Sequence, residues 1–122
     1  MGRKVNNLNG TLKQGKSLMD EVICFYGTDN EKLQAIEKLS SLIQIISYYE
    51  CSPSRNMKIR NSTIAQKMAE VMVCLSELKL IYKISDIDIN SYVESRLASI
   101  DCDLQQRLYN HLRRYDTEIG LL

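Results

Sequence analysis

The chain has 122 residues, of which 44% are hydrophobic and 25% are charged, and its 16 basic and 15 acidic residues leave a net charge of +1. A chain of this size and composition forms one folded domain and is too apolar to be disordered. The small net charge favours neither a nucleic acid nor a membrane surface as a partner. We expect a flexible N-terminus at residues 1–11 and a single domain over residues 12–122.

The cysteines and the apolar runs indicate a cellular compartment. Cys24, Cys51, Cys74 and Cys102 are widely spaced and include no C-x-x-C pair, so no zinc site is expected. No apolar run reaches the ~20 residues that cross a bilayer, and the polar N-terminus lacks the apolar core of a signal peptide. We therefore expect a cytoplasmic protein with reduced cysteines and no membrane partner.

Helical periodicity dominates the first half of the chain, which contains few breakers because the whole sequence has one proline and five glycines. A first helix is predicted from about Leu12 to Phe25, with Gly27 as its stop. Thr28-Asp-Asn-Glu31 has the pattern of a capping box, in which the threonine and glutamate side chains bind backbone N–H groups. A second helix is predicted after it, from about Asn30 to Glu50.

The second half repeats this pattern after a loop. Residues 51–61 contain the only proline and are predicted to be that loop. Thr63-Ile-Ala-Gln66 is read as a second capping box, although Asn61 or Ser62 could also cap, and the third helix runs to about Tyr82. Ser85-Asp-Ile-Asp88 starts a fourth helix over roughly residues 87–112. This helix is either continuous or broken near residues 101–103.

The predicted fold class is all-α, because the alternation typical of strands is nearly absent. Two long antiparallel helices flanked by two more give a four-helix bundle or half of a larger one. The second helix also carries apolar residues beyond its inward stripe, among them Ile45, Ile46, Tyr48 and Tyr49. We therefore expect homodimerisation or higher oligomerisation to complete the bundle.

Two triplets of polar positions occur at the helical spacing i, i+1, i+4, which places three side chains close enough to share one divalent cation. Magnesium requires hard oxygen ligands, and two such triplets on facing helices can make a carboxylate cage for metal ions over a triphosphate. The six positions are Glu37, Lys38 and Ser41 on the second predicted helix and Gln66, Lys67 and Glu70 on the third. Only Glu37 and Glu70 carry a carboxylate.

The stretches YGTDNEKLQAIEKLSSLIQIISYY and NSTIAQKMAEVMVCLSELKLIYKI, separated by a loop, resemble the MazG-like all-α nucleoside triphosphate pyrophosphohydrolases. The resemblance covers about residues 20–100 and is greatest to the short single-domain versions carried by phages and prophages. That family pairs an E-E-x-x-E helix with an E-E-x-x-D helix across a loop. The resemblance implies a MazG-like four-helix bundle and a cleft that holds Mg²⁺ over a nucleotide.

In this chain the two acidic motifs are largely replaced. Where the family has six acids, the six positions hold two acids, two lysines and two neutral residues, so the formal charge changes from −6 to 0. At an effective dielectric constant of about 20, a pair of unit charges at ~4 Å interacts by roughly 4 kcal/mol, so two ammonium groups would strongly disfavour Mg²⁺. We interpret these positions as a vestigial metal site and the chain as a pseudoenzyme, with no catalytic residue, metal or other cofactor assigned.

The leading functional hypothesis is a catalytically degenerate MazG-like protein that acts as a non-hydrolytic nucleotide-binding or protein-binding regulatory module. The phage-type resemblance extends it to a phage-encoded inhibitor or sequestering protein. Lys38, Lys67 and Arg96 are candidate phosphate-binding residues, acting as fixed cations in place of Mg²⁺. Arg96 is included because the family's final helix often shows K-x-x-R, of which Val93-Glu-Ser-Arg96 keeps only the arginine.

Three other readings stay open. The charged residues of the two triplets could form an interhelical salt-bridge cluster without a ligand. A Mg²⁺-dependent pyrophosphohydrolase with an atypical ligand set would need Glu31, Glu50, Glu77 or Asp86 as additional ligands, and their spacing does not predict one cluster. A purely structural helical oligomer is the third.

Overall fold

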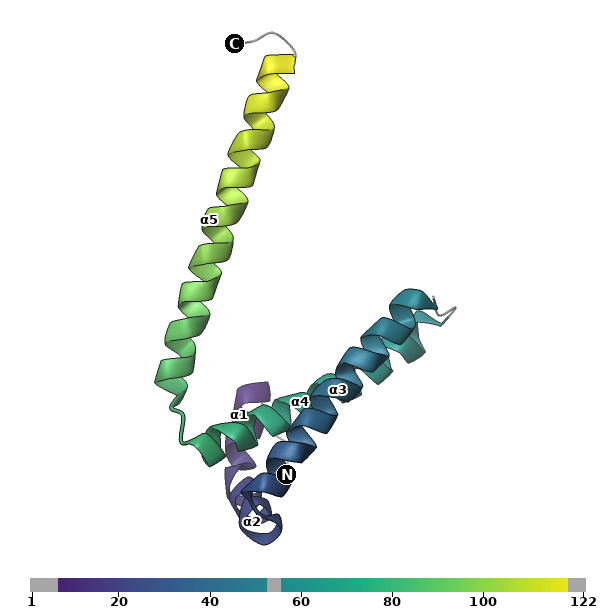
Figure 1. Cartoon of the computed structure of the whole chain (residues 1–122), viewed down its shortest axis with the longest axis vertical. Coiled ribbons are helices and arrows are strands. Elements are labelled where there is room, and N and C mark those ends of the chain that lie inside the picture. Colours follow the sequence, from purple (N-terminus) through teal and green to yellow (C-terminus); the bar gives the residue numbers. More distant parts are fainter. Residues whose placement is uncertain (1–6, 53–55, 119–122) are drawn as a thin grey trace, which may run out of the picture. The chain divides into compact units, whose positions relative to one another are not determined.

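The computed structural model describes residues 7–52 and 56–118, and every regular element in these two segments is an α-helix. The prediction of an all-α protein is therefore confirmed. The helices are, in chain order, α1 (Leu8–Gln14), α2 (Lys16–Tyr26), α3 (Thr28–Cys51), α4 (Met57–Tyr82) and α5 (Asp86–Glu118) (Figure 1). The chain divides after Lys83 into two compact units, which are described separately.

The first predicted helix is two helices, so its prediction as one continuous element is wrong. Asn7 starts α1 by accepting a hydrogen bond from the Gly10 N–H at 2.7 Å, a cap that the sequence prediction missed. A turn at Gly15 separates α1 from α2. Of the N-terminus predicted to be flexible, residues 1–6 lie outside the described residues, and the part from Leu8 to Thr11 is helical.

The capping box predicted at Thr28 is also wrong. The N-cap of α3 is Gly27, whose φ of 88° lies in the left-handed region that favours glycine, and no side chain caps this helix. Glu31 is instead buried, with 7% of its surface exposed, and accepts a hydrogen bond from Asn30 Nδ2 at 3.3 Å. The residue expected at the helix start therefore belongs to the interior of this unit.

Helix α4 begins earlier than predicted, so residues 57–61 of the expected loop at residues 51–61 are helical. The Asn56 side chain caps it by accepting from the N–H groups of Lys58 and Ile59, both at 3.1 Å. The predicted capping box at Thr63 is wrong, because its hydroxyl donates to the Ile59 carbonyl within the helix at 2.9 Å. The part of the predicted loop at residues 53–55 lies outside the described residues.

Helix α5 starts as predicted and then continues further. Ser85 Oγ accepts a hydrogen bond from the Asp88 N–H at 3.2 Å, which confirms the serine as a cap. The helix runs without interruption to Glu118, so the break considered near residues 101–103 does not occur. An ion pair between Arg107 Nε and Asp103 Oδ2 at 3.1 Å links successive turns at that point.

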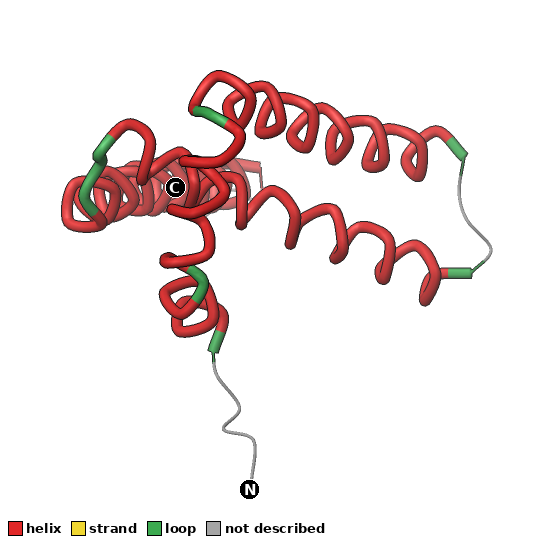
Figure 2. Tube along the Cα trace, turned by 90° about the horizontal axis from the view of Figure 1, so that it is seen from below, coloured by secondary structure: helices red, strands yellow, loops and turns green. Residues whose placement is uncertain are grey.

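The first unit is built around the antiparallel hairpin of α3 and α4, which lie side by side in Figures 1 and 2 and share the most extensive helix–helix contact. Helix α2 packs against both of them, and α1 contacts α2. Lys32 Nζ lies 4.9 Å from the centre of the Tyr82 ring, a cation–π contact between the start of α3 and the end of α4. No described helix is both long enough and apolar enough to span a membrane.

The hydrophobic core is small. Within residues 7–52 and 56–118, the buried apolar residues are Met19, Ala35, Val71 and Cys74. Large apolar side chains remain at the surface of α3, where Leu33, Ile36 and Ile43 are 60–65% exposed. Packing within the chain therefore leaves much of the apolar surface of this helix uncovered, although burial of such surface is the main stabilising term of folding.

Replacing Ala35 tests the hairpin contact. Ala35 is 2% exposed, so Ala35→Leu forces extra atoms into a closed contact and should lower the free energy of unfolding by about 1–3 kcal/mol. Ala65→Leu, at an exposed position of α4, is the matched control and should change it by less than about 0.5 kcal/mol. Urea denaturation measures both. Equal effects of the two substitutions would contradict the burial of Ala35.

Candidate functional site

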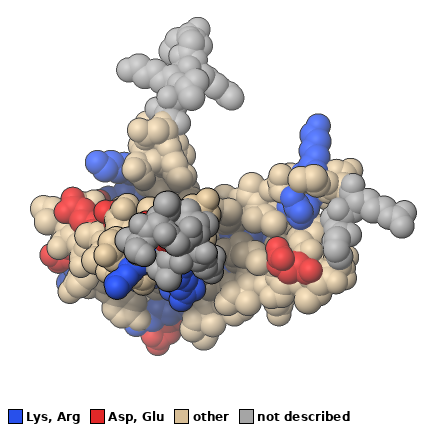
Figure 3. Space-filling view, turned by 90° about the horizontal axis from the view of Figure 1, so that it is seen from above, with Lys and Arg blue, Asp and Glu red and all other residues tan. Residues whose placement is uncertain are grey.

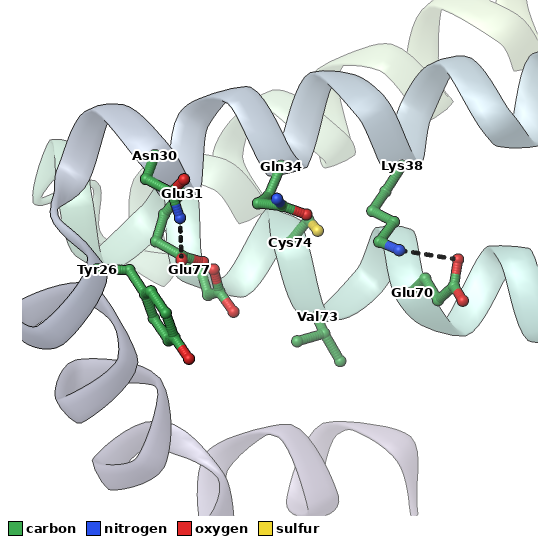
Figure 4. A pocket seen from close by; sticks show the side chains of 9 residues that line it. All are labelled: Tyr26, Asn30, Glu31, Gln34, Lys38, Glu70, Val73, Cys74 and Glu77. Carbon is green, nitrogen blue, oxygen red and sulfur yellow. Dashed lines mark hydrogen bonds and ion pairs between the residues drawn. The ribbon is translucent and has the colours of Figure 1, made fainter.

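Three of the predicted site residues meet on the α3/α4 hairpin. Lys38 Nζ, from α3, lies 3.9 Å from Oε2 of Glu70, and Lys67 Nζ, one turn before Glu70 on α4, lies 3.6 Å from the same oxygen. That oxygen is buried and has no hydrogen-bond partner. Its charge is therefore balanced by the two nearby ammonium groups, each at ion-pair distance. Figure 4 shows Lys38 and Glu70 pointing toward one another across the hairpin.

The other predicted positions do not join this cluster in the same way. Glu37 and Gln66 are exposed, and Ser41 is half-buried. Arg96 lies on α5, in the second unit. In the part of the chain that the structure describes, no group of three or more histidine, cysteine or acidic side chains is placed to hold a metal ion.

A groove of 390 Å³ runs along the hairpin beside this cluster. One of its lining residues comes from α2, and the others come from the facing sides of α3 and α4 (Figure 4). They are Tyr26, Asn30, Glu31, Gln34, Lys38, Glu70, Val73, Cys74 and Glu77. Lys38 and Glu70 lie at one end, and Tyr26 lies near Glu31 and Glu77 at the other.

Glu31 and Glu77 form a carboxyl pair that sequence reasoning did not place together. Both line the groove that also contains Glu70, so part of the atypical acid set considered for a metal is clustered after all. A signal for this pairing was available, because Glu31 and Lys38 are seven residues apart on α3, as are Glu70 and Glu77 on α4. An antiparallel register that pairs Lys38 with Glu70 therefore also pairs Glu31 with Glu77, two turns or about 10 Å away.

This pair shares a proton near neutral pH. Burial of the Glu77 carboxyl, followed by its hydrogen bond and charge repulsion with Glu31, raises the pKa of Glu77 to about 7. The protonated Glu77 carboxyl can then donate a hydrogen bond to Glu31. With this raised pKa, Glu77 is largely uncharged over the weakly acidic pH range, in which an ordinary glutamate is ionised.

Cys74 lies between the two charged pairs and is itself buried. Burial is the main cause that raises the pKa of its thiol, and the carboxylate of Glu77 adds to it, while the Lys38 ammonium acts in the opposite direction. A thiol with a raised pKa stays protonated and is a poor nucleophile. Cys74 therefore contributes packing rather than thiolate chemistry.

The electrostatics of the groove oppose a polyphosphate. Three carboxyl groups line it, from Glu31, Glu70 and Glu77, against the single lysine Lys38. A triphosphate would bring several more negative charges to a surface whose one lysine is already ion-paired with Glu70. On the face shown in Figure 3, uncharged residues form most of the visible surface, and basic and acidic residues form small separate patches.

No known protein family matches the chain, and neither a characterised protein nor a solved structure matches it. The fold and the groove therefore describe the protein only as an α-helical hairpin that carries a cluster of two lysines and one carboxylate.

The carboxyl pair predicts a pH dependence of stability. The folded-state pKa of Glu77 is raised, so the folded protein keeps a proton that the unfolded chain releases. Its contribution to stability is complete below the unfolded pKa and is lost as the pH rises through about 7. Between about pH 5 and 8 the free energy of unfolding of the wild type should therefore fall relative to that of Glu77→Gln. The expected fall is roughly 1 kcal/mol, because solvent screens the charge of this partly exposed group.

Urea denaturation at several pH values measures this difference. Glu37→Gln, which neutralises an exposed carboxyl on the same hairpin, is the matched control and should follow the wild-type pH profile. Parallel profiles for the wild type and Glu77→Gln would show that the two carboxyls do not share a proton.

Proposed function

We propose that the chain is a degenerate MazG-like protein that lacks metal-dependent hydrolysis and serves as a protein-binding regulatory module. The observation that carries this proposal is the position of the Glu70 carboxylate between the ammonium groups of Lys38 and Lys67, at 3.9 and 3.6 Å. In MazG-like enzymes, residues at these positions are the acids that hold Mg²⁺. In this chain two lysine ammonium groups lie at ion-pair distance from the Glu70 carboxylate.

The residues present do not fit a magnesium ion. Mg²⁺ requires near-octahedral oxygen ligation and is held in proteins through carboxylates. Of the six motif positions, Glu37 and Glu70 alone supply carboxylates, Glu37 is exposed, and Glu70 is already paired with two lysines. Each lysine would repel a divalent ion at similar distance by several kcal/mol, on the order of the 4 kcal/mol expected for unit charges at ~4 Å.

A protein partner fits the surface better than a nucleotide does. The groove is lined by three carboxyls and one lysine, whereas α3 presents Leu33, Ile36 and Ile43 largely exposed. Exposed apolar side chains at helical spacing are the means by which one helical protein docks on another. We further propose that a homo-oligomer completes a MazG-like four-helix bundle. The biological role that we propose is that of a phage-encoded inhibitor or sequestering protein.

Non-hydrolytic nucleotide binding is the second candidate, and one observation favours it. Lys38 and Lys67 come from different helices and converge on one oxygen atom of Glu70. A phosphate group could replace that carboxylate as their shared partner, since both lysine side chains remain about one-third exposed. The neighbouring carboxyls oppose this mode of binding, which is why it ranks second.

Restoring the acids tests the MazG-like arrangement and the loss of its metal. A variant carrying Lys38→Glu, Ser41→Glu, Gln66→Glu and Lys67→Glu has six acids at the six positions. We expect Mg²⁺ or Mn²⁺ to raise its melting temperature by several degrees, since a ligand that binds only the folded state stabilises it. The wild type should show no such shift. The matched control, Lys38→Gln with Ser41→Gln and Lys67→Gln, removes the lysines without adding acids and should not respond to metal.

Two results would overturn the proposal. Metal-dependent release of pyrophosphate from a nucleoside triphosphate by the wild type, abolished in Glu70→Ala, would show an active enzyme. A folded acid-restored variant that binds no metal would show that the two helices are not arranged as in the MazG-like family.

A nucleotide panel separates the two candidate functions. Canonical and modified nucleotides are added without metal, and the melting temperature is followed. Protein binding predicts no stabilisation of the wild type by any of them. Stabilisation that is lost in both Lys38→Ala and Lys67→Ala, and retained in Glu37→Ala, would favour the nucleotide-binding module instead.

A further inference from the structure

Helix α5 forms the whole described part of the second unit, and its apolar residues have nothing within that unit to pack against. An isolated helix in water is only marginally stable, and most helical stability in proteins comes from packing of an amphipathic face. With 33 residues, α5 is about 50 Å long at 1.5 Å per residue. It is longer than either α3 or α4, which have 24 and 26 residues. A second copy of α5 would match it in length and in apolar pattern.

The apolar positions of α5 form one continuous stripe. They repeat at intervals of four, four and three residues, as shown by Ile89, Val93, Leu97, Ile100, Leu104 and Leu108. The same spacing continues through His111, which interrupts the apolar residues, to Tyr115. This 11-residue repeat corresponds to 3.67 residues per turn, close to the 3.6 of a straight helix, and it favours a slight right-handed supercoil in place of the left-handed supercoil of a heptad repeat. The stripe can therefore be buried over its full length by a second, nearly straight helix.

Charge is distributed unequally along α5, and this distribution specifies an orientation. Residues 86–103 contain five acids and only Arg96 as a base, for a net charge of −4. Residues 104–118 contain three arginines and two acids, for a net charge of +1. Parallel pairing of two copies would place the two acidic halves against each other. Antiparallel pairing places each acidic half against the basic half of the other copy.

We infer that α5 pairs with α5 of a second copy of this chain, in antiparallel orientation, through the stripe defined above. The two ends of the stripe, Ile89 and Tyr115, are equally distant from residue 102, so the two-fold axis passes near that position. Ile89 then lies opposite Tyr115 of the partner subunit, and Ile100 lies opposite Leu104 of the partner subunit. This inference rests on the homo-oligomer of the proposed function and adds the surface and the orientation.

Light scattering on the full-length chain tests whether the stripe is the interface. The wild type should have the mass of a dimer or a higher multiple, and Ile100→Glu should shift it to the monomer, because the new charge would be buried opposite Leu104 of the partner subunit without a charged partner. Ser95→Glu places the same charge on the opposite face of α5 and is the matched control, which should keep the wild-type mass. Circular dichroism verifies that both variants stay helical.

The outcomes of this measurement separate the two proposals. An Ile100→Glu variant that keeps the oligomer mass would overturn the pairing through α5 and leave a homo-oligomer formed by another surface. A monomeric wild type would overturn both the α5 pairing and the oligomer of the proposed function. The loss of metal-dependent hydrolysis and the choice between protein and nucleotide binding would still be decided by the metal and nucleotide tests.

Disulfide cross-linking tests the orientation. In a background with Cys24→Ser, Cys51→Ser and Cys102→Ser, one variant carries Ile89→Cys and another carries Tyr115→Cys. Antiparallel pairing predicts little cross-linking of either variant alone and a cross-linked dimer when the two are mixed and oxidised, because a disulfide needs Cα atoms within about 7 Å. Cross-linking of each variant with itself would show a parallel pair. Absence of cross-linking in all three samples, with dimer mass retained, would show that the stripe is not paired in either register.

Discussion

The packing of α3 against α4 decides which charged side chains meet in the first unit. Ala35 lies on the same face of α3 as Glu31 and Lys38 and is nearly inaccessible, and a small side chain at such a position permits close helix packing. Once the hairpin is closed in that register, Lys38 faces Glu70 at one end of the groove and Glu31 faces Glu77 at the other. The opposite charges of the first pair attract, and the second pair holds together through a proton. Burial and electrostatics of the groove both follow from this one helix contact.

A second constraint is the limited amount of apolar surface that the chain covers by itself. A sequence with 44% hydrophobic residues buries Met19, Ala35, Val71 and Cys74 among the described residues. The surplus is arranged in order: Leu33, Ile36 and Ile43 lie at helical spacing on α3, and the apolar positions of α5 repeat every eleven residues. Periodic exposed surfaces of this kind are typical of helices that associate with other helices. Two separate features, one in each unit, therefore support association as part of what this protein does.

The helical fold could be predicted from the sequence because period 3.6 dominates and breakers are few, whereas the helix ends could not. Asn7 and Asn56 cap α1 and α4, and both were overlooked because Thr28 and Thr63 begin patterns that satisfy the capping-box rule. At Thr28 the buried environment of Glu31 overrode that local preference. The proximity of Lys67 and Glu70 is predictable from helical spacing, because both lie on α4. The Lys38–Glu70 and Glu31–Glu77 pairs cross the hairpin and depend on its register, which the spacing within one helix does not give.

The two ends of the groove differ in whether the charge interactions and the helix packing favour the same arrangement. At the Glu70 end, charge and helix packing favour the same closed arrangement. At the Glu77 end, packing brings together two acids that repel whenever their shared proton is lost, so the contact is locally frustrated. Local opening of a protein begins where contacts conflict, at a free-energy cost below that of global unfolding. The hairpin would therefore fray first beside Tyr26, where α2 meets α3, and the Glu70 end would act as the fixed end of that motion.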